Sequence, residues 1–441
     1  MVKLPKGRTY QLNTDLDMIF DGLEDIPYGP RWLGMKIRKG EYHVELGGPK
    51  NEYKSYLYMG ITDNVDEIED GKFELIGPDM PEIEPGSSFP VGIDVRAWGE
   101  HLTDEYTEYF DRTLNGCWDY IEDVMLINAR NTIWIRVGKG AAETLTFPKI
   151  AQLTYAILKT SMPLVEKVQI QMIIGSEEVG GLDLLGKLSE EYEKRWDILD
   201  ARYQDLRDED VDVFYGCTIC QTFAPNHVCV ISPERMPYCG ILSYNGAKIG
   251  AQIDPHGYVF TVEKGECLDD KLGIYSGANE IIFDKSNMST EKVSLYSCLH
   301  YPQTNCGCFE CSVFYIPQLD GVGVVSRAHF GDTPLGIPFS RIAAVMSGGG
   351  QNDGFMGTSV RAMRQRKFLF GDGGYERVVW LNDALKTQVA EAIPEEIYDR
   401  IPTEKDAVNW EDIKKYLIEK EHPIIERYWV DGEPVPQDLS E

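Results

Sequence analysis

The 441-residue sequence predicts an α+β fold with two domains, each built on irregular mixed sheets. Strand-like alternation and long helical periodicity occur together in the first 210 residues or so. The second half is rich in Gly and in short strand candidates, and it holds nine of the ten cysteines, from Cys217 to Cys311. We place the boundary near residues 206–212 and predict domains 1–208 and 209–441.

Composition and charge narrow the class of protein. Hydrophobic residues make up 43% of the chain, which is enough for sizeable cores and excludes a mainly disordered protein. The formal net charge of -29 argues against nucleic acid or an anionic membrane as a partner. The N-terminal residues lack the apolar core of a signal peptide, and no apolar run approaches the ~20 residues of a membrane span. We therefore expect a soluble, cytoplasmic protein whose cysteines are thiols or metal ligands.

In the N-terminal half, residues 131–137 alternate as a strand does, with Ile133, Ile135 and Val137 on one face and Trp134 and Arg136 on the other. Further along the chain, the pattern predicts a helix over 150–158, a strand over 165–174 and a long amphipathic helix over 184–206. The acidic stretch 63–84 has nine acidic residues and one Lys, and we interpret it as a solvated loop or face.

In the C-terminal half, residues 311–316 and 322–325 are strand candidates, and a last helix is expected over 410–421. Between them lies a Gly-rich segment, 347–357, for which we favour a structural role. The tail after Trp429 is polar and contains two prolines, so we expect it to form a loop.

The first cysteine motif is C-x2-C-x8-C-x9-C, formed by Cys217, Cys220, Cys229 and Cys239. Four thiolates suit either tetrahedral zinc or a [4Fe–4S] cluster. Structural zinc sites commonly use two short Cys pairs, whereas only one pair is short here, and this spread favours the larger cubane. Buried packing cysteines are the competing interpretation, which four cysteines within 23 residues make weak.

The second motif is Cys306-Gly307-Cys308. Its two thiolates and the deprotonated amides of Gly307 and Cys308 can form a square-planar S2N2 site, a geometry typical of Ni(II) or Cu(II). A lone Cys-Gly-Cys also arises by chance, but beside a four-cysteine cluster a coupled metal site is the better interpretation.

Together these motifs resemble those of the acetyl-CoA synthase catalytic subunit, the beta subunit of acetyl-CoA decarbonylase/synthase in archaeal complexes. The downstream segments 348–351, 354–357, 371–374 and 378–380 also resemble this family, and the resemblance covers essentially the whole chain. Longer bacterial members carry an extra N-terminal domain that docks onto carbon monoxide dehydrogenase. Nothing in this sequence matches that domain, so we expect the short, archaeal-like form or a minimal core.

The resemblance implies a nickel–nickel–[4Fe–4S] centre, the A-cluster. The cubane would be held by four cysteines, Cys217, Cys220, Cys229 and Cys239. Cys220 would bridge it to a proximal nickel, and Cys306 and Cys308 would bridge that nickel to a distal nickel. The distal nickel would be completed by the amides of Gly307 and Cys308, and Phe223 would gate the small ligand. The implied reaction joins CO, coenzyme A and the methyl group of a methylated corrinoid iron–sulfur protein into acetyl-CoA, or reverses this step. Carbon monoxide dehydrogenase is the second implied partner. Of the two predicted domains, 1–208 is expected to contact coenzyme A and the corrinoid protein, and 209–441 to hold the A-cluster.

Other residues have more local interpretations. Trp134 and Arg136 are candidates for stacking on coenzyme A and binding its phosphates, and a packed Trp beside a surface Arg is the alternative. His227 is expected to hydrogen-bond a ligand sulfur or to cap a turn. We interpret Cys117, Cys267 and Cys298 as packing residues, and Cys311 has no ligand role in the family pattern.

Two alternative functions of the whole chain remain open, an iron–sulfur electron-transfer subunit and a zinc-stabilised scaffold subunit.

Overall fold

The computed structural model describes residues 7–15, 26, 37, 40–48, 51, 55–118, 121–127, 130–162, 164–177 and 181–439. The chain divides into two compact units, Met1–Arg202 and Tyr203–Glu441. This division precedes the predicted boundary at residues 208 and 209, and the functional roles assigned to the two domains stay predictions. Among the described residues, no helix has the length and apolar character needed to cross a membrane.

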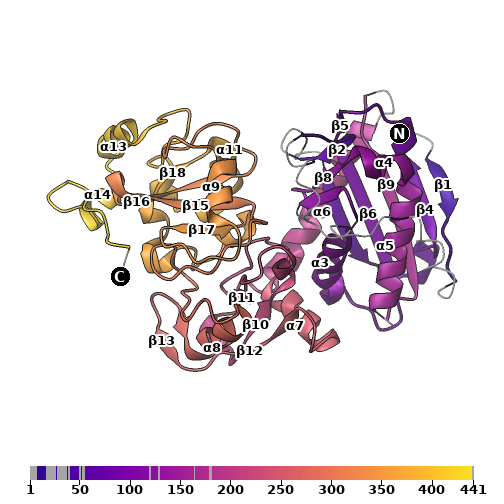
Figure 1. Ribbon diagram of the computed structural model, residues 1–441, viewed down its shortest axis with the longest axis horizontal. Coiled ribbons are helices and arrows are strands. Elements are labelled where there is room, and N and C mark those ends of the chain that lie inside the picture. Colours follow the sequence, from indigo (N-terminus) through magenta and orange to yellow (C-terminus); the bar gives the residue numbers. More distant parts are fainter. Residues whose placement is uncertain are drawn as a thin grey trace. The chain divides into compact units, whose positions relative to one another are not determined.

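The N-terminal unit contains two mixed sheets, as the predicted α+β class requires (Figure 1). The five-stranded sheet has the order β1-β4-β9-β6-β3 and consists of β1 (Arg8–Gln11), β4 (Lys72–Ile76), β9 (Lys167–Ile174), β6 (Val91–Trp98) and β3 (Tyr56–Ile61). The four-stranded sheet has the order β5-β2-β8-β7 and consists of β5 (Ser87–Phe89), β2 (Val44–Gly47), β8 (Trp134–Val137) and β7 (Val124–Ile127). Parallel and antiparallel pairs alternate in the larger sheet.

The helices of this unit are α3 (Thr107–Trp118), α4 (Lys139–Thr144), α5 (Phe147–Ser161) and α6 (Gly181–Ala201). Figure 1 shows α5 and α6 running alongside strands of the larger sheet. Buried side chains of α6 pack against β3, and the rings of Tyr58 and Tyr192 stack with centroids 3.8 Å apart. The predicted helices over 150–158 and 184–206 and the strands over 131–137 and 165–174 are therefore confirmed, with shifted ends.

The long helix ends at Ala201, before the predicted end at residue 206. Its apolar periodicity continues through Tyr203 and Leu206, but these side chains pack in the C-terminal unit. Tyr203 is buried there, and its hydroxyl lies 4.0 Å from the sulfur of Met236. The helix was predicted too long because its apolar spacing continues past Ala201, into residues whose side chains belong to the core of the C-terminal unit.

The acidic stretch 63–84 is in part the solvated loop or face that we predicted, because none of its nine acidic residues is buried. The stretch also contains β4, which was not predicted, and in this strand Phe73 and Leu75 are at most 1% exposed. Lys72 and Glu74 alternate with these apolar side chains and lie on the other face of the strand.

The C-terminal unit begins with an antiparallel sheet of order β11-β10-β12, in which β10 (Val213–Cys217) lies between β11 (Cys229–Ile231) and β12 (Val259–Glu263). The elements that follow are α7 (Tyr244–Ile253), β13 (Cys267–Asp269), β14 (Ile274–Tyr275) and α8 (Ser276–Lys285). Cys267 on β13 is exposed, so its interpretation as a packing residue was wrong. Cys298 is fully buried, as predicted, and the side chain of Cys117 lies outside the described residues.

A second sheet in this unit has the order β17-β15-β16-β18 and consists of β17 (Phe355–Thr358), β15 (Cys311–Ile316), β16 (Gly321–Ser326) and β18 (Val378–Leu381). Its strands confirm the predictions over 311–316 and 322–325. Around it lie α9 (Phe339–Met346), α10 (Val360–Met363), α11 (Asp383–Gln388), α12 (Glu395–Tyr398), α13 (Trp410–Glu419) and α14 (Ile424–Arg427). All six residues of β15 are buried, so this sheet is a rigid support for the loop that precedes it.

Candidate metal centre

The β10–β11 pair brings two of the predicted ligands opposite each other. Cys217 is the last residue of β10 and Cys229 the first of β11, and their Cα atoms are direct partners in the antiparallel register. Side chains at such a pair leave the same face of the sheet about 5 Å apart. The eleven residues between them form the loop that carries Cys220 and Phe223.

Cys220 lies on a short 3-10 helix, Ile219–Thr222, which follows β10 directly. The helix is closed by the amide of Ala224, which donates to the Cys220 carbonyl at 2.9 Å. Cys239 lies in a tight turn in which the Gly240 amide donates to the Pro237 carbonyl at 3.0 Å. Burial, together with the nearby thiols of Cys217 and Cys239, raises the pKa of the Cys229 thiol to about 12.

The Cys306-Gly307-Cys308 segment is fixed by the residue before it. The Asn305 amide donates to the Gly350 carbonyl at 2.9 Å, and the Asn305 carbonyl accepts from the Gly349 amide at 2.8 Å. The Asn305 side chain is fully buried, and its Oδ1 accepts from the Gly357 amide at 2.7 Å. The Gly-rich segment thus brackets the Cys-Gly-Cys loop, which supports the structural role we predicted for it.

Glycine is required at two positions of this bracket. Gly307 has φ +108°, and a Cβ there would lie 2.9 Å from Cβ of Ser347. Gly349 has φ +93°, and a Cβ there would lie 3.0 Å and 3.1 Å from the backbone nitrogens of Asn226 and His227. The second glycine therefore lets the bracket approach the loop that carries the first cysteine motif.

Three predicted ligands are in sulfur contact. Cys220 and Cys306 pack in one cluster, and Cys308 packs against it. The neighbouring thiols of Cys306 and Cys308, together with burial, raise the pKa of the Cys220 thiol well above the usual range. The Cys308 amide donates to Cys306 Sγ at 3.3 Å. One sulfur from the first motif therefore meets both sulfurs of the second motif.

His227 supports this group of sulfurs, as one of its two predicted roles required. His227 Nδ1 forms a hydrogen bond with Thr304 Oγ1 at 3.1 Å, and Thr304 Oγ1 also accepts from the Val228 amide at 3.2 Å. His227 Nε2 forms a hydrogen bond with Cys229 Sγ at 3.1 Å. Burial lowers the pKa of His227 to about 4, so the ring is neutral near pH 7. Possible ligand atoms of Cys220, His227 and Cys306 all lie within 4.8 Å of one another.

A buried cation and two aromatic rings complete the surroundings. Arg235 is 6% exposed, and its Nη1 donates to the carbonyls of Val230 and Met236 at 3.1 and 3.0 Å. The guanidinium lies 5.0 Å from the ring of Tyr238, which stacks on His227, and its charge opposes the rise in the pKa of Cys229. Phe223 is half-buried and packs against the cluster of Cys220, Ala224 and Cys306.

This donor set suits a thiophilic metal centre. Buried thiols in mutual contact bind their protons firmly, and a metal cation would replace those protons and hold the sulfurs as thiolates. A backbone nitrogen, that of Cys308, already faces the same space as the sulfurs. The residues present therefore fit the two nickel ions and the [4Fe–4S] cluster that the resemblance implies.

The structure places Trp134 and Arg136 in the other unit, where both are engaged by Glu45. This carboxylate is 3% exposed and accepts from Trp134 Nε1 at 3.1 Å and from Arg136 Nε at 2.6 Å. The guanidinium also lies 4.6 Å from the centroid of the Trp134 ring. β8 is an interior strand of its sheet, and the Arg136 charge is neutralised within the unit. A role of this pair in binding coenzyme A stays a prediction.

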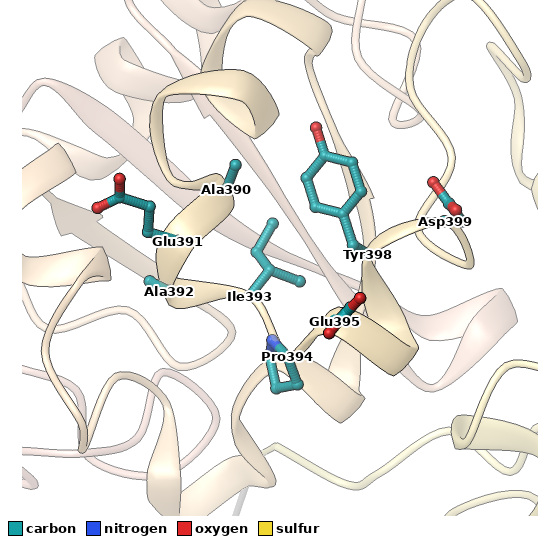
Figure 2. A pocket seen from close by; sticks show the side chains of 8 residues that line it. All are labelled: Ala390, Glu391, Ala392, Ile393, Pro394, Glu395, Tyr398 and Asp399. Atoms are coloured by element: carbon teal, nitrogen blue, oxygen red, sulfur yellow. The ribbon is translucent and has the colours of Figure 1, made fainter.

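A hollow of about 580 Å³ in the C-terminal unit contains none of the predicted site residues (Figure 2). Among the described residues that line it, three are acidic, namely Glu391, Glu395 and Asp399, and none is basic. It therefore lacks the cations that the phosphates of coenzyme A require.

The fold and the site define an α+β protein with a buried, cysteine-rich centre suited to metal. A family described as the C-terminal part of the ACS/CODH beta subunit matches residues 192–428, and one described as the beta subunit of the CO dehydrogenase/acetyl-CoA synthase complex matches residues 25–179. The chain belongs to this family of acetyl-CoA decarbonylase/synthase complex beta subunits.

Two archaeal relatives show how far the similarity extends. Subunit beta 2 of the acetyl-CoA decarbonylase/synthase complex of Methanocaldococcus jannaschii is 45% identical over 407 residues, covering 92% of this chain and 84% of that protein. Subunit beta of the same complex from Methanopyrus kandleri is 42% identical over 415 residues, covering 93% of this chain and 87% of that protein.

Sequence reasoning assigned no role to Asn305, Arg235 or Arg327, although each holds the centre. Arg235 and Arg327 act by donating to backbone carbonyls, and the bonds of Asn305 also run to the backbone. Such partners leave no spacing pattern in a sequence. The one available signal was a lone Arg within four residues of Cys239.

Proposed function

We propose that this chain is an acetyl-CoA synthase. It would condense CO, coenzyme A and the methyl group of a methylated corrinoid iron–sulfur protein into acetyl-CoA, or run the reverse cleavage. The observation that carries the proposal is the contact of the Cys220 thiol with both thiols of the Cys306-Gly307-Cys308 segment. Two motifs of different metal preference, far apart in the sequence, thereby share one site.

The proposed ligands follow from these contacts. Cys217, Cys229 and Cys239, with Cys220, would hold the [4Fe–4S] cluster, and His227 would hydrogen-bond the Cys229 sulfur as it does now. Cys220, Cys306 and Cys308 would hold the proximal nickel. Cys306, Cys308 and the amides of Gly307 and Cys308 would hold the distal nickel.

When bound, the metal centre supplies the nucleophile for the methyl group and the binding position for CO. The described residues around it supply enclosure and order. Cys220 and Cys306 are buried, and the fixed bracket around Asn305 holds the second motif in place. Phe223, which packs on this group, would control the access of a small ligand. Removing the ring by Phe223→Ala should admit ligands larger than CO.

The partners proposed are the corrinoid iron–sulfur protein and carbon monoxide dehydrogenase, with coenzyme A as the thiol substrate. Members of the family are beta subunits of the acetyl-CoA decarbonylase/synthase complex, which is consistent with such partners. Six thiols that must stay reduced suit the cytoplasm. The acyltransferase class of the enzyme is part of this same proposal.

Metal analysis of protein prepared without oxygen tests the proposal and its alternatives. We expect roughly two nickel and four iron per chain. Iron without nickel would favour an electron-transfer subunit, and zinc without iron would favour a scaffold subunit.

A matched pair of cysteine variants sharpens this test. Cys308→Ala should abolish acetyl-CoA formation and lower the nickel content while leaving the iron in place. Cys267→Ala, which changes an exposed cysteine in the same unit, should alter neither metal content nor synthesis. Retained synthesis in Cys308→Ala would refute the assignment.

A further inference from the structure

Arg327 reaches from the end of β16 onto the Cys-Gly-Cys segment. Its backbone amide donates to the Glu310 carbonyl at 2.8 Å, which fixes the start of the side chain beside the segment. Its Nη2 donates to the Gly307 carbonyl at 3.1 Å and to the Phe309 carbonyl at 2.6 Å. A half-buried guanidinium thus binds the main chain inside the second motif.

The Gly307 carbonyl has a particular place in the chemistry of this segment. Its carbon is bonded to the nitrogen of Cys308, so the two atoms belong to one resonant peptide group. When the nitrogen binds a divalent metal, its proton leaves to solvent, and the peptide group gains one negative charge. Resonance places much of that charge on the Gly307 oxygen, the atom to which Arg327 donates.

We propose that Arg327 is the positioning residue that stabilises the deprotonated Cys308 peptide group when a square-planar metal binds the segment. This inference rests on the proposed function, because it assumes that the backbone nitrogens are ligands. An arginine keeps its charge at all pH values relevant here, so the stabilisation would be constant. Arg327 would also determine which metal the segment prefers. It would favour metals that displace amide protons, such as Ni(II) or Cu(II), over zinc, because zinc binds the thiolates alone.

The positive charge of Arg327 distinguishes stabilisation of a deprotonated peptide group from simple anchoring of the loop. Asn305 already fixes the segment through neutral hydrogen bonds to Gly350, Gly349 and Gly357. A neutral peptide group gains little more from a cation than from a neutral donor, whereas a charged one gains a charge-assisted hydrogen bond. The effect of Arg327 should therefore depend on which metal is bound.

Metal binding to the reduced, metal-free full chain tests the proposal. Nickel and zinc affinities would be measured by competition with a chelator for the wild type, Arg327→Gln, Arg327→Lys and Arg400→Gln. Arg400 is the matched control, because its Nη1 donates to the Glu421 carbonyl, away from the cysteines. The absorption spectrum and magnetic moment of bound nickel would report whether it is square planar and diamagnetic.

We expect Arg327→Gln to weaken nickel binding by about ten- to hundredfold, the size of a lost charge-assisted hydrogen bond, and to leave zinc binding unchanged. Arg327→Lys should recover part of the nickel affinity, because it restores the charge without the fixed fork. Arg400→Gln should match the wild type for both metals.

Two results would overturn the role of Arg327 alone. One is unchanged, square-planar nickel binding in Arg327→Gln, and the other is an equal loss of nickel and zinc, which would indicate only a collapsed loop. A wild-type protein that binds no square-planar nickel would instead refute the proposed function, and the inference with it. Failure of the two proposals is thus distinguishable.

Discussion

Replacing Asn305 by Ala is the most direct way to test how the fold holds the second cysteine motif. Asn305 is fully buried, and its Oδ1 accepts from the Gly357 amide at 2.7 Å, while its Nδ2 makes a long contact of 3.4 Å with the Phe355 carbonyl. Gly357 lies on β17, an edge strand, so its amide would be left buried without this partner. A buried unsatisfied donor costs about 1–3 kcal/mol, and the small cavity left by the amide adds about 1 kcal/mol.

The expected local destabilisation is therefore about 2–4 kcal/mol, which amounts to roughly thirty- to several-hundredfold in the opening equilibrium. Hydrogen exchange read by mass spectrometry on peptides covering residues 303–310 and 355–358 would measure it, without assuming two-state unfolding of the whole chain. Asn352→Ala is the matched control, because the Asn352 side chain lies in the same region but makes only long contacts, 3.4 and 3.5 Å, with the carbonyls of Met346 and Gly350. Exchange in Asn305→Ala that equals the wild type in both peptides would refute the reasoning.

Three further predictions concern two buried arginines and a buried histidine. Arg136→Ala should destabilise the N-terminal unit by about 3–5 kcal/mol in denaturant melts, because it leaves the buried Glu45 carboxylate without its ion-pair partner. The KM for coenzyme A should change only if Arg136 also binds that substrate. Arg235→Met should lower the reduction potential of the proposed iron–sulfur cluster by on the order of tens of mV in a potentiometric titration, because the positive charge that it removes would stabilise the more negative, reduced cluster. Arg235→Lys, which keeps this charge, should stay close to the wild type. Burial lowers the pKa of His422 to about 4, whereas its pKa in the unfolded chain is about 6.5. Between these two pH values the unfolded chain binds more protons than the folded chain. The free energy of unfolding should therefore fall by about 3 kcal/mol as the pH falls from 6.5 to 4. His422→Gln should lose this part of the pH dependence in urea midpoints, and an unchanged acid-induced loss would contradict the reasoning.

Strands with a clear alternation and helices with a sustained period were predictable from sequence. Ile135 and Val137 of β8 enter the core with Ile133, which precedes the strand, and Trp134 and Arg136 share the other face, as the pattern required. Two boundaries were missed. The apolar period of α6 continues into a second core, so the helix was predicted too long, and the short buried strand β4 was not recognised inside the acidic stretch 63–84.

The candidate site was predictable to the extent that it is made of cysteines. Their spacing indicated two coupled motifs, and the structure brings Cys220 against Cys306 and Cys308. The residues that position these ligands act on backbone atoms, so only coordinates reveal them. Asn305 and Arg327 reach backbone atoms that lie 52 and 18 residues away, whereas Arg235 reaches carbonyls one and five residues away. A single sequence carries no record of such pairings with the backbone.

The chain as a whole is acidic, yet two arginines lie beside its cysteines. The net charge of -29 indicates a surface that repels polyanions, whereas Arg235 and Arg327 donate to main-chain carbonyls next to the two cysteine motifs. The proposed centre of thiolates and deprotonated amides would be strongly anionic, and burial would make each of its charges costly unless a cation lay close by. An acidic surface screened by water cannot meet that need, whereas a guanidinium fixed by main-chain carbonyls beside the ligands can. The two arginines therefore follow from the chemistry of the ligands rather than from the composition of the chain.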